Sequence, residues 1–243
     1  LSLPPPPPTT PLELDRRQRQ MCIRDRGGVI SPLLANIFLH YVLDEWFVED
    51  VQPRMRGRCF LVRYADDFII GFETEDDARR VMDVLPKRFA RFGLSIHPEK
   101  TKLVRFGRPP RGDAPEGNGT VDFLGFTYFW AKSRRGKWII KKKTRGTRVN
   151  RFVKSIWQWC RINRHEPLEE QHKQLCLKLR GHYQYYAVNH NYQALNDVWH
   201  HSKRAWHYWL SKRCSKGVLI WDNFESIMNA KFPLPRSRIL HQI

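Results

Sequence analysis

The stretch LVRYADDFIIGF, Leu61–Phe72, constrains the fold more than any other part of the sequence. Two runs rich in β-branched and aromatic residues, CFLVRY and FIIGF, flank Ala65-Asp66-Asp67. Apolar runs of this kind around a short break are typical of two antiparallel strands joined by a tight turn. The sequence therefore predicts a β-hairpin that carries two adjacent carboxylates, Asp66 and Asp67, at its tip.

An Asp-Asp pair by itself is typical of a solvated turn, because Asp hydrogen-bonds its own backbone there. The apolar context favours a functional interpretation, since adjacent carboxylates on a rigid hairpin offer the oxygen ligands that Mg²⁺ prefers. Two such ions about 3.5–4 Å apart would stabilise both the attacking and the leaving oxygen of a phosphoryl displacement. Asp66 and Asp67 are therefore candidate catalytic and metal-binding residues.

Positive charge is concentrated in the second half of the chain. The net charge of the 243 residues is +19, and residues 131–243 contribute +18 of it, with 24 Lys and Arg against 6 Asp and Glu. Such a field attracts polyanions, above all nucleic acid. The five cysteines are scattered, and no apolar run approaches the roughly 20 residues of a membrane span. We therefore expect a reduced, cytoplasmic protein with a polyanionic partner.

Residues 1–26 have neither helical nor strand periodicity. Their first part, LSLPPPPPTTPLELD, has the composition of a proline-rich linker. Residues 16–25, RRQRQMCIRD, resemble the translation of an adapter used to prepare sequencing libraries. We interpret residues 1–26 as a disordered adapter artefact and expect the natural chain to begin at Gly27.

Several elements are predicted around the hairpin. A helix should begin with Ser31 as its N-cap, and a second one should begin at a capping box of Thr74 and Asp77 and end at Gly93. Short strands are expected at 94–97 and 101–106. A second hairpin should pair DFLGFTYFW with KWIIKK across the turn SRRG.

After Lys143 the apolar residues recur at helical spacing in three segments. The opposite face of each expected helix is rich in Lys, Arg and His. We therefore predict an α+β fold, with antiparallel hairpins and packed helices over residues 27–143 and an all-α basic bundle over 144–243. Tryptophan and tyrosine at such spacing usually pack in a core, so we assign Trp199, Trp206 and Tyr183 to packing.

Four blocks follow one another along the chain: GGVISPLLANIFLHYVLDEW, YADD, GLSIHPEKTKLVRFG and FLGFTY. Their order and spacing are far more specific than YADD alone, and they resemble the palm of reverse transcriptases. The helical end, with LRGHYQYYAV and FPLPRSRIL, resembles the thumb or maturase (X) region of group II intron reverse transcriptases. The resemblance covers Gly27–Ile243.

The resemblance implies an RNA-directed DNA polymerase of a bacterial mobile element that uses two Mg²⁺ ions and also binds its intron RNA to assist splicing. Its partners would be an RNA template, the intron RNA, a DNA primer and dNTPs. Asp66 would bind both metals, and Asp67 would contribute more weakly or indirectly. Residues implied to lie near the nucleotide or primer are Tyr64, Ala65, Lys100, Leu124 and Gly125. Candidates for RNA phosphates are Lys141, Lys142, Lys143, Arg145, Arg148, Arg180, Lys203 and Arg204.

The resembled family has a further metal-binding Asp upstream of the GGVISP block, where this chain has adapter-like sequence. We therefore expect a partial enzyme, half of a palm plus a thumb, that is inactive alone. Two alternatives stay open: an RNA-binding maturase with a vestigial polymerase site, and a reverse transcriptase of a diversity-generating or CRISPR-linked element. The two aspartates favour an enzyme over the first alternative, and the long basic thumb speaks against the second.

Overall fold

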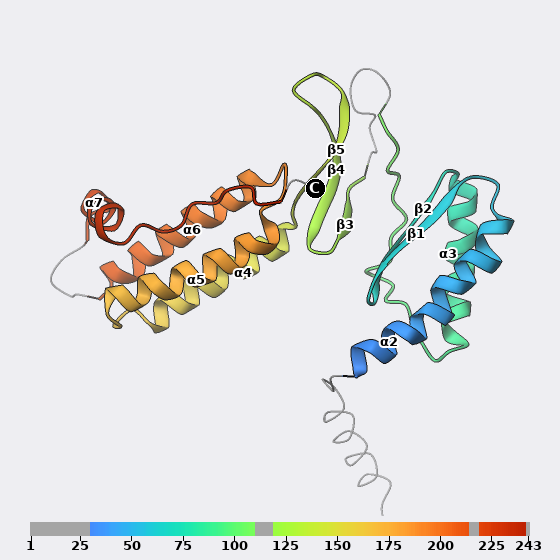
Figure 1. The fold of residues 1–243 in the computed structure, drawn as a ribbon, viewed down its shortest axis with the longest axis horizontal. Helices are drawn as coiled ribbons and strands as arrows, with labels where there is room; N and C mark the ends of the chain where they lie inside the picture. The colour runs from blue at the N-terminus through green and yellow to red at the C-terminus, as the bar shows by residue number, and fades with distance from the viewer. Residues whose placement is uncertain (1–29, 110–118, 214–218, 242–243) are drawn as a thin grey trace, which may run out of the picture. The chain divides into compact units, whose positions relative to one another are not determined.

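The computed structural model describes residues 30–109, 119–213 and 219–241 (Figure 1). It mixes helices with two small antiparallel sheets, as expected for the α+β class. The chain divides into two compact units between Leu103 and Val104. We predicted a domain boundary at 143/144, which is where strands give way to helices inside the second unit. Residues 1–26, which we interpret as an adapter artefact, lie outside the described residues.

The first unit begins with a helical segment that changes its winding. It comprises α2 (Ser31–Leu39), two π-helical segments, η1 (His40–Glu45) and η2 (Phe47–Val51), and a 3₁₀ turn, η3 (Gln52–Arg54). The predicted N-cap is shifted by one residue: Ile30 is the cap and Ser31 is already helical, a difference within the usual uncertainty of helix ends. No residue of α2 is buried, whereas η1 and η2 contribute core residues such as Leu43 and Phe47.

The predicted hairpin is confirmed. Strands β1 (Cys59–Tyr64) and β2 (Asp67–Phe72) pair antiparallel, and Tyr64 opposite Asp67 is the pair nearest the turn. Because side chains alternate along a strand, Leu61 and Ile70 share the face that packs on the core of this unit. The opposite face of β1 leaves three large side chains exposed, Phe60, Val62 and Tyr64.

Helix α3 (Glu75–Ala90) covers the inner face of this hairpin with Val81, Leu85 and Phe89. Its predicted start is confirmed, because the Thr74 hydroxyl accepts a hydrogen bond from the Asp77 N–H. The strands predicted at 94–97 and 101–106 are wrong: neither segment forms a strand. A β-strand needs a continuous partner for its backbone groups, and in the described ranges neither segment is paired with a strand; a single backbone bond, from the Gly119 N–H to the Arg105 carbonyl oxygen, does not make one.

The second unit opens with a three-stranded sheet, β3 (Val121–Phe123), β4 (Phe126–Lys132) and β5 (Trp138–Thr144), in the order β3-β4-β5. The predicted turn at SRRG joins β4 to β5. The predicted pairing is confirmed for FTYFW and KWIIKK, whereas Asp122 and Phe123 belong to a separate strand, because a two-residue turn at Leu124-Gly125 separates β3 from β4. Both turn residues have left-handed backbone, with φ of 51° and 80°, which closes a tight hairpin.

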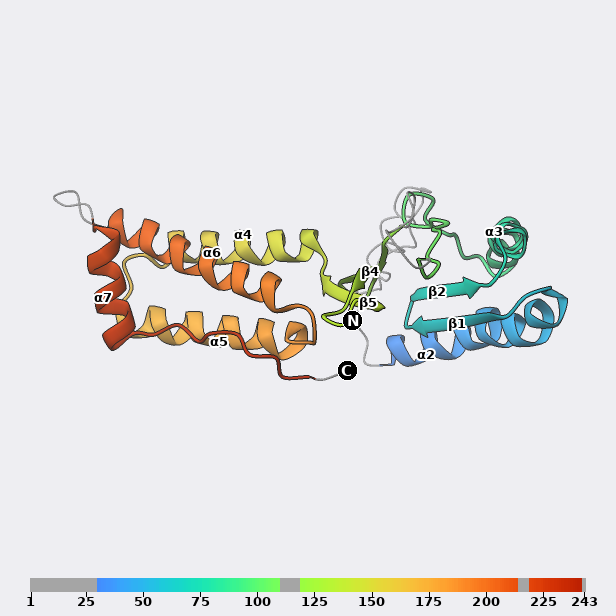
Figure 2. The ribbon, with the colours of Figure 1, turned by 90° about the horizontal axis from the view of Figure 1, so that it is seen from above.

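Four helices complete this unit: α4 (Gly146–Ile162), α5 (Leu168–Tyr186), α6 (Tyr192–Ser211) and α7 (Trp221–Lys231). The first three confirm the predicted bundle, and α7, which we did not predict, lies across one end of it (Figures 1 and 2). Trp199, Trp206 and Tyr183 are buried in the core, as predicted. No helix in the described ranges has the length and apolar character that crossing a membrane requires.

Candidate active site and nucleic-acid-binding surface

The tip of the β1–β2 hairpin is a two-residue turn formed by Ala65 and Asp66. Ala65 has a φ of 53°, in the left-handed region that few residues other than glycine adopt. Such a conformation costs about 1–2 kcal/mol and is found where the surrounding structure enforces it. Asp66 and Asp67 are both exposed at this tip. The turn therefore presents two neighbouring carboxylates to solvent on a strained but ordered backbone.

Arg63 enforces this turn from the inner face of β1. Its Nε and Nη2 donate to the two carboxylate oxygens of Asp44 at 2.8 and 2.6 Å, and its Nη1 donates to Asn36 Oδ1 at 3.0 Å. Nη1 also donates to the carbonyl oxygen of Ala65 at 2.9 Å. One guanidinium thus connects the turn to both α2 and η1. The Arg63 side chain is 13% exposed, so these bonds are largely shielded from water.

The ion pair between Asp44 and Arg63 shifts the pKa of both groups. The hydrogen bonds from Arg63 hold the pKa of Asp44 below its ordinary value, against the opposing effect of burial. The same bonds raise the pKa of Arg63. Arg63 is therefore the main partner of Asp44, and His40 Nδ1 lies 3.4 Å from one of its carboxylate oxygens. Sequence reasoning missed Arg63, although an arginine on the same strand face as Leu61 was a detectable signal.

The donor set at the tip suits a hard cation but is incomplete. Carboxylate oxygens are the ligands that Mg²⁺ prefers, and Asp66 and Asp67 supply them side by side. Within residues 30–109, 119–213 and 219–241, no cluster of three or more His, Cys, Asp or Glu side chains could hold a metal. Lys100, a predicted nucleotide contact, lies in an exposed turn after α3. The described tip can therefore supply part of a metal site.

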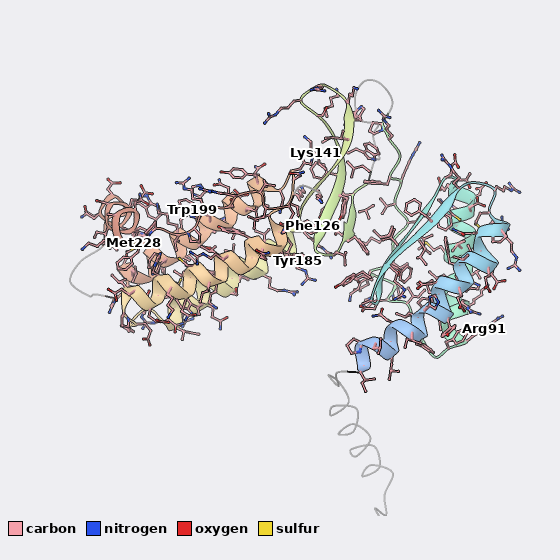
Figure 3. All side chains as sticks on the ribbon, viewed as in Figure 1. Arg91, Phe126, Lys141, Tyr185, Trp199 and Met228 are labelled. Carbon is pink, nitrogen blue, oxygen red and sulfur yellow. The ribbon has the colours of Figure 1, made fainter. Side chains whose placement is uncertain are left out.

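The turn between β3 and β4 is held in a different way. Tyr185 Oη on α5 donates to the Leu124 carbonyl oxygen at 2.9 Å, and the Arg145 N–H donates to the Gly125 carbonyl oxygen. A Cβ on residue 125 would lie 2.9 Å from Tyr186 Oη, so glycine permits this close approach. Figure 3 shows Tyr185 beside Phe126, whose ring it stacks on at a centroid distance of 5.8 Å. Sequence reasoning had not assigned roles to Tyr185 and Tyr186.

The predicted RNA-binding residues do not share one environment. Lys143, Arg145, Arg148, Arg180 and Arg204 are exposed, and Lys141 and Lys142 are half-buried on β5. The Arg145 guanidinium lies 3.1 Å from a carboxylate oxygen of Asp122. Lys203 is a correction: it is 5% exposed and its ammonium pairs with Glu225 on α7, so it joins α6 to α7. We remove Lys203 from the RNA-binding set.

Comparison with known proteins identifies a family for part of the chain. Residues 12–128 match the family model of reverse transcriptases, RNA-dependent DNA polymerases. The match includes the Asp66-Asp67 hairpin and the Leu124-Gly125 turn, and it supports a reverse transcriptase domain in this part of the chain. It begins inside the segment that we interpret as an adapter artefact. No curated protein matches the chain.

Proposed function

We propose that this chain is part of a group II intron reverse transcriptase, with the β1–β2 hairpin as the catalytic part of its palm. The observation that carries the proposal is the strained Ala65-Asp66 turn, which holds Asp66 and Asp67 at the tip of a hairpin inside the matched segment. A two-residue hairpin turn requires left-handed backbone, and Ala65 adopts it here without the freedom of a glycine, which places both carboxylates at the tip.

In this mechanism Asp66 and Asp67 would hold Mg²⁺, which when bound neutralises the charge that develops on the transferring phosphoryl group. Arg63 would act through position alone, because its bond to the carbonyl oxygen of Ala65 fixes the turn residue that precedes Asp66. The backbone at Leu124 and Gly125 would receive the primer end, held in place by Tyr185. Positioning of this kind accounts for a large part of enzymatic rate enhancement.

Uncovered apolar surface in the first unit supports the view that the palm described here is partial. Helix α2 buries no residue, and one face of the β1–β2 hairpin exposes large side chains. Contiguous apolar surface normally packs against further protein. The exposed apolar residues on these two elements are Leu33, Leu34, Ile37, Phe38, Phe60, Val62 and Tyr64. We propose that the rest of a palm, with the remaining metal ligand, covers them.

The basic helices of the second unit would bind the phosphates of the template and of the intron RNA, which is the maturase part of the proposal. Helix α4 contains no acidic residue, and Arg148, Arg180 and Arg204 are exposed. Phosphate contacts position a protein on RNA without reading its sequence. This part of the proposal rests on charge and on the resemblance of the helical end.

Primer extension with Mg²⁺ tests the polymerase proposal. We expect no synthesis from the 243-residue chain and restored synthesis after fusion to the upstream palm and fingers segment of a related reverse transcriptase. Robust synthesis by the 243 residues would refute the incomplete metal site. A fusion that folds but never extends a primer would favour the alternative, an RNA-binding maturase with a vestigial site.

Salt dependence tests the RNA-binding proposal. Binding that neutralises about six phosphates should weaken roughly a thousandfold between 50 and 200 mM salt. The triple change of Arg148, Arg180 and Arg204 to Gln should weaken binding and flatten this dependence. A matched triple change of Arg54, Arg58 and Arg79, exposed arginines of the first unit, should do neither. Equal effects of the two triples would mean that charge acts without a defined surface.

A further inference from the structure

The outer side of α4 and α6 carries two exposed aromatic rings, Trp157 and Tyr208, beside Trp209, which is partly buried against the core. Trp157 stacks on Tyr208 with centroids 5.1 Å apart and an interplanar angle of 30°, and it meets Trp209 edge to face at 6.1 Å. Trp157 is 39% and Tyr208 43% exposed. These values contrast with Trp206 on the same helix, which is 1% exposed. The two exposed rings therefore form a surface that is open to a ligand.

A groove lies beside these rings. Its volume is about 440 Å³, within the range of sites that accept small organic groups. The residues that line it are Val153, Lys154, Trp157, Gln158, Arg161 and Trp209. Trp209 also has a buried indole N–H that no group in the described residues accepts, which costs free energy unless a further acceptor is present.

The rim of the groove is cationic. The Arg161 guanidinium lies 5.9 Å from the centre of the Trp209 ring, and the Lys212 ammonium lies 5.7 Å from that of Tyr208. Lys154 is a further cation of the lining, and α4 offers no carboxylate to neutralise it. An apolar protein segment bound in the groove would leave these cations without an anionic partner. A nucleotide offers both a flat ring for the aromatic surface and a phosphate for the rim.

We propose that this groove binds an unpaired nucleobase of single-stranded RNA, stacked on Trp157, with the adjoining phosphates on Lys154 and Arg161. The inference rests on the proposed RNA binding of the second unit and adds a specific subsite to it. Stacking on an aromatic side chain suits unpaired bases, because paired bases in a duplex present no free face. The subsite therefore makes this unit prefer single-stranded over double-stranded RNA.

The test uses the full 243-residue chain and fluorescently labelled RNA of equal length in single-stranded and double-stranded form. Trp157→Ala should weaken binding of the single strand by about tenfold to a hundredfold, the usual effect of losing one stacked base, and leave duplex binding unchanged. Trp157→Leu, which keeps apolar volume but removes the ring system, should show the same loss. Tyr192→Ala, an exposed aromatic near the start of α6 and outside the groove lining, is the matched control and should change neither.

An RNA set that places a single abasic nucleotide at successive positions separates stacking from phosphate contact. The native protein should bind at least one of these strands about tenfold more weakly than the intact strand, and Trp157→Leu should not discriminate among them. Equal loss on single strand and duplex, or native affinity in both Trp157 variants, would overturn the subsite while the basic surface stands. Failure of the native protein to bind either RNA would instead refute the proposed RNA binding itself.

Discussion

The β1–β2 and β3–β4 hairpins both close through two residues, and both require left-handed backbone, at Ala65 in the first and at Leu124 and Gly125 in the second. Their anchors differ. An arginine in an ion pair holds the first turn, and a tyrosine located 61 residues further along the chain, Tyr185, holds the second. The first turn exposes charge, while the second offers mainly its backbone. Similar turn geometry thus presents two different surfaces, one that carries carboxylate charge and one that offers closely packed backbone.

The largest expected effect is a loss of primer extension rate, caused by a substitution at the first turn that leaves the fold of the turn intact. In the fusion that restores primer extension, Asp66→Ala should reduce the rate by at least about a hundredfold, because it removes the proposed shared ligand of the metals. Asp83→Ala removes an exposed carboxylate from α3 and is the matched control, with activity unchanged. Primer extension rates measure both. Comparable losses in the two variants would contradict the assignment of Asp66.

Removing the first turn's anchor should cost stability. Arg63→Met leaves the Asp44 carboxylate partly buried without its partner, which should lower the free energy of opening around residues 59–72 by about 2–3 kcal/mol. Arg79→Met breaks an exposed pair with Glu75 on the surface of α3, where a loss of about 0.5 kcal/mol is expected. Hydrogen exchange of the hairpin amides measures the two changes. Equal effects would show that Arg63 does not anchor the turn.

As the pH falls, the contacts around Tyr186 in the second unit should lose stability before the Asp44–Arg63 ion pair of the first unit does. His182 stacks on Phe152 and lies against Tyr186, and burial lowers its pKa from 6.5 to about 4. The unfolded state therefore binds a proton between pH 6.5 and 4 that the folded state does not, so stability falls as pH falls through this window. The pKa of Asp44 is lowered too, so its bond to Arg63 persists through the same window.

The expected loss in the second unit is about 2 kcal/mol between pH 7 and 4.5. His182→Phe should remove most of this dependence, whereas His165→Phe, at an exposed position, should keep it. Urea unfolding followed by tryptophan fluorescence reports mainly on the second unit, which holds eight of the nine tryptophans. A His182→Phe variant with native pH dependence would exclude His182 as the cause.

The smallest expected effect concerns the close packing of Gly125 in the second turn. Gly125→Ala should destabilise the second unit by about 1–2 kcal/mol, from backbone strain and from the approach of its Cβ to Tyr186 Oη. Gly136→Ala carries the same kind of strain, at a φ of 71°, but its Cβ meets no atom within 4 Å, so about 1 kcal/mol is expected. Adding Tyr186→Phe should restore part of the stability lost in Gly125→Ala and none of that lost in Gly136→Ala. Identical losses of stability at both glycines would show that the close contact with Tyr186 makes no contribution.

Local patterns predicted the elements whose stability is mostly local. The β1–β2 hairpin follows from two β-rich runs around a short break, and the Thr74 cap follows from hydrogen bonds within one turn of helix. The same patterns misplaced strands at 94–97 and 101–106, because a strand exists only where a partner lies beside it. They also did not separate β3 from β4, because Gly125 is the one signal of a turn within the apolar run DFLGFTYFW, and the position of the turn depends on pairing between the strands.

The sequence by itself determined which side chains are available: an acidic pair at a hairpin tip, a basic second half, and aromatic residues at helical spacing. Only the tertiary structure decided how each is used. Lys203 looked like its basic neighbours but is buried against Glu225, and Trp157, to which the sequence assigned no place, is partly exposed beside Tyr208. The reason is physical: helical periodicity specifies a face, but contacts between elements distant in the chain decide whether that face meets protein or water.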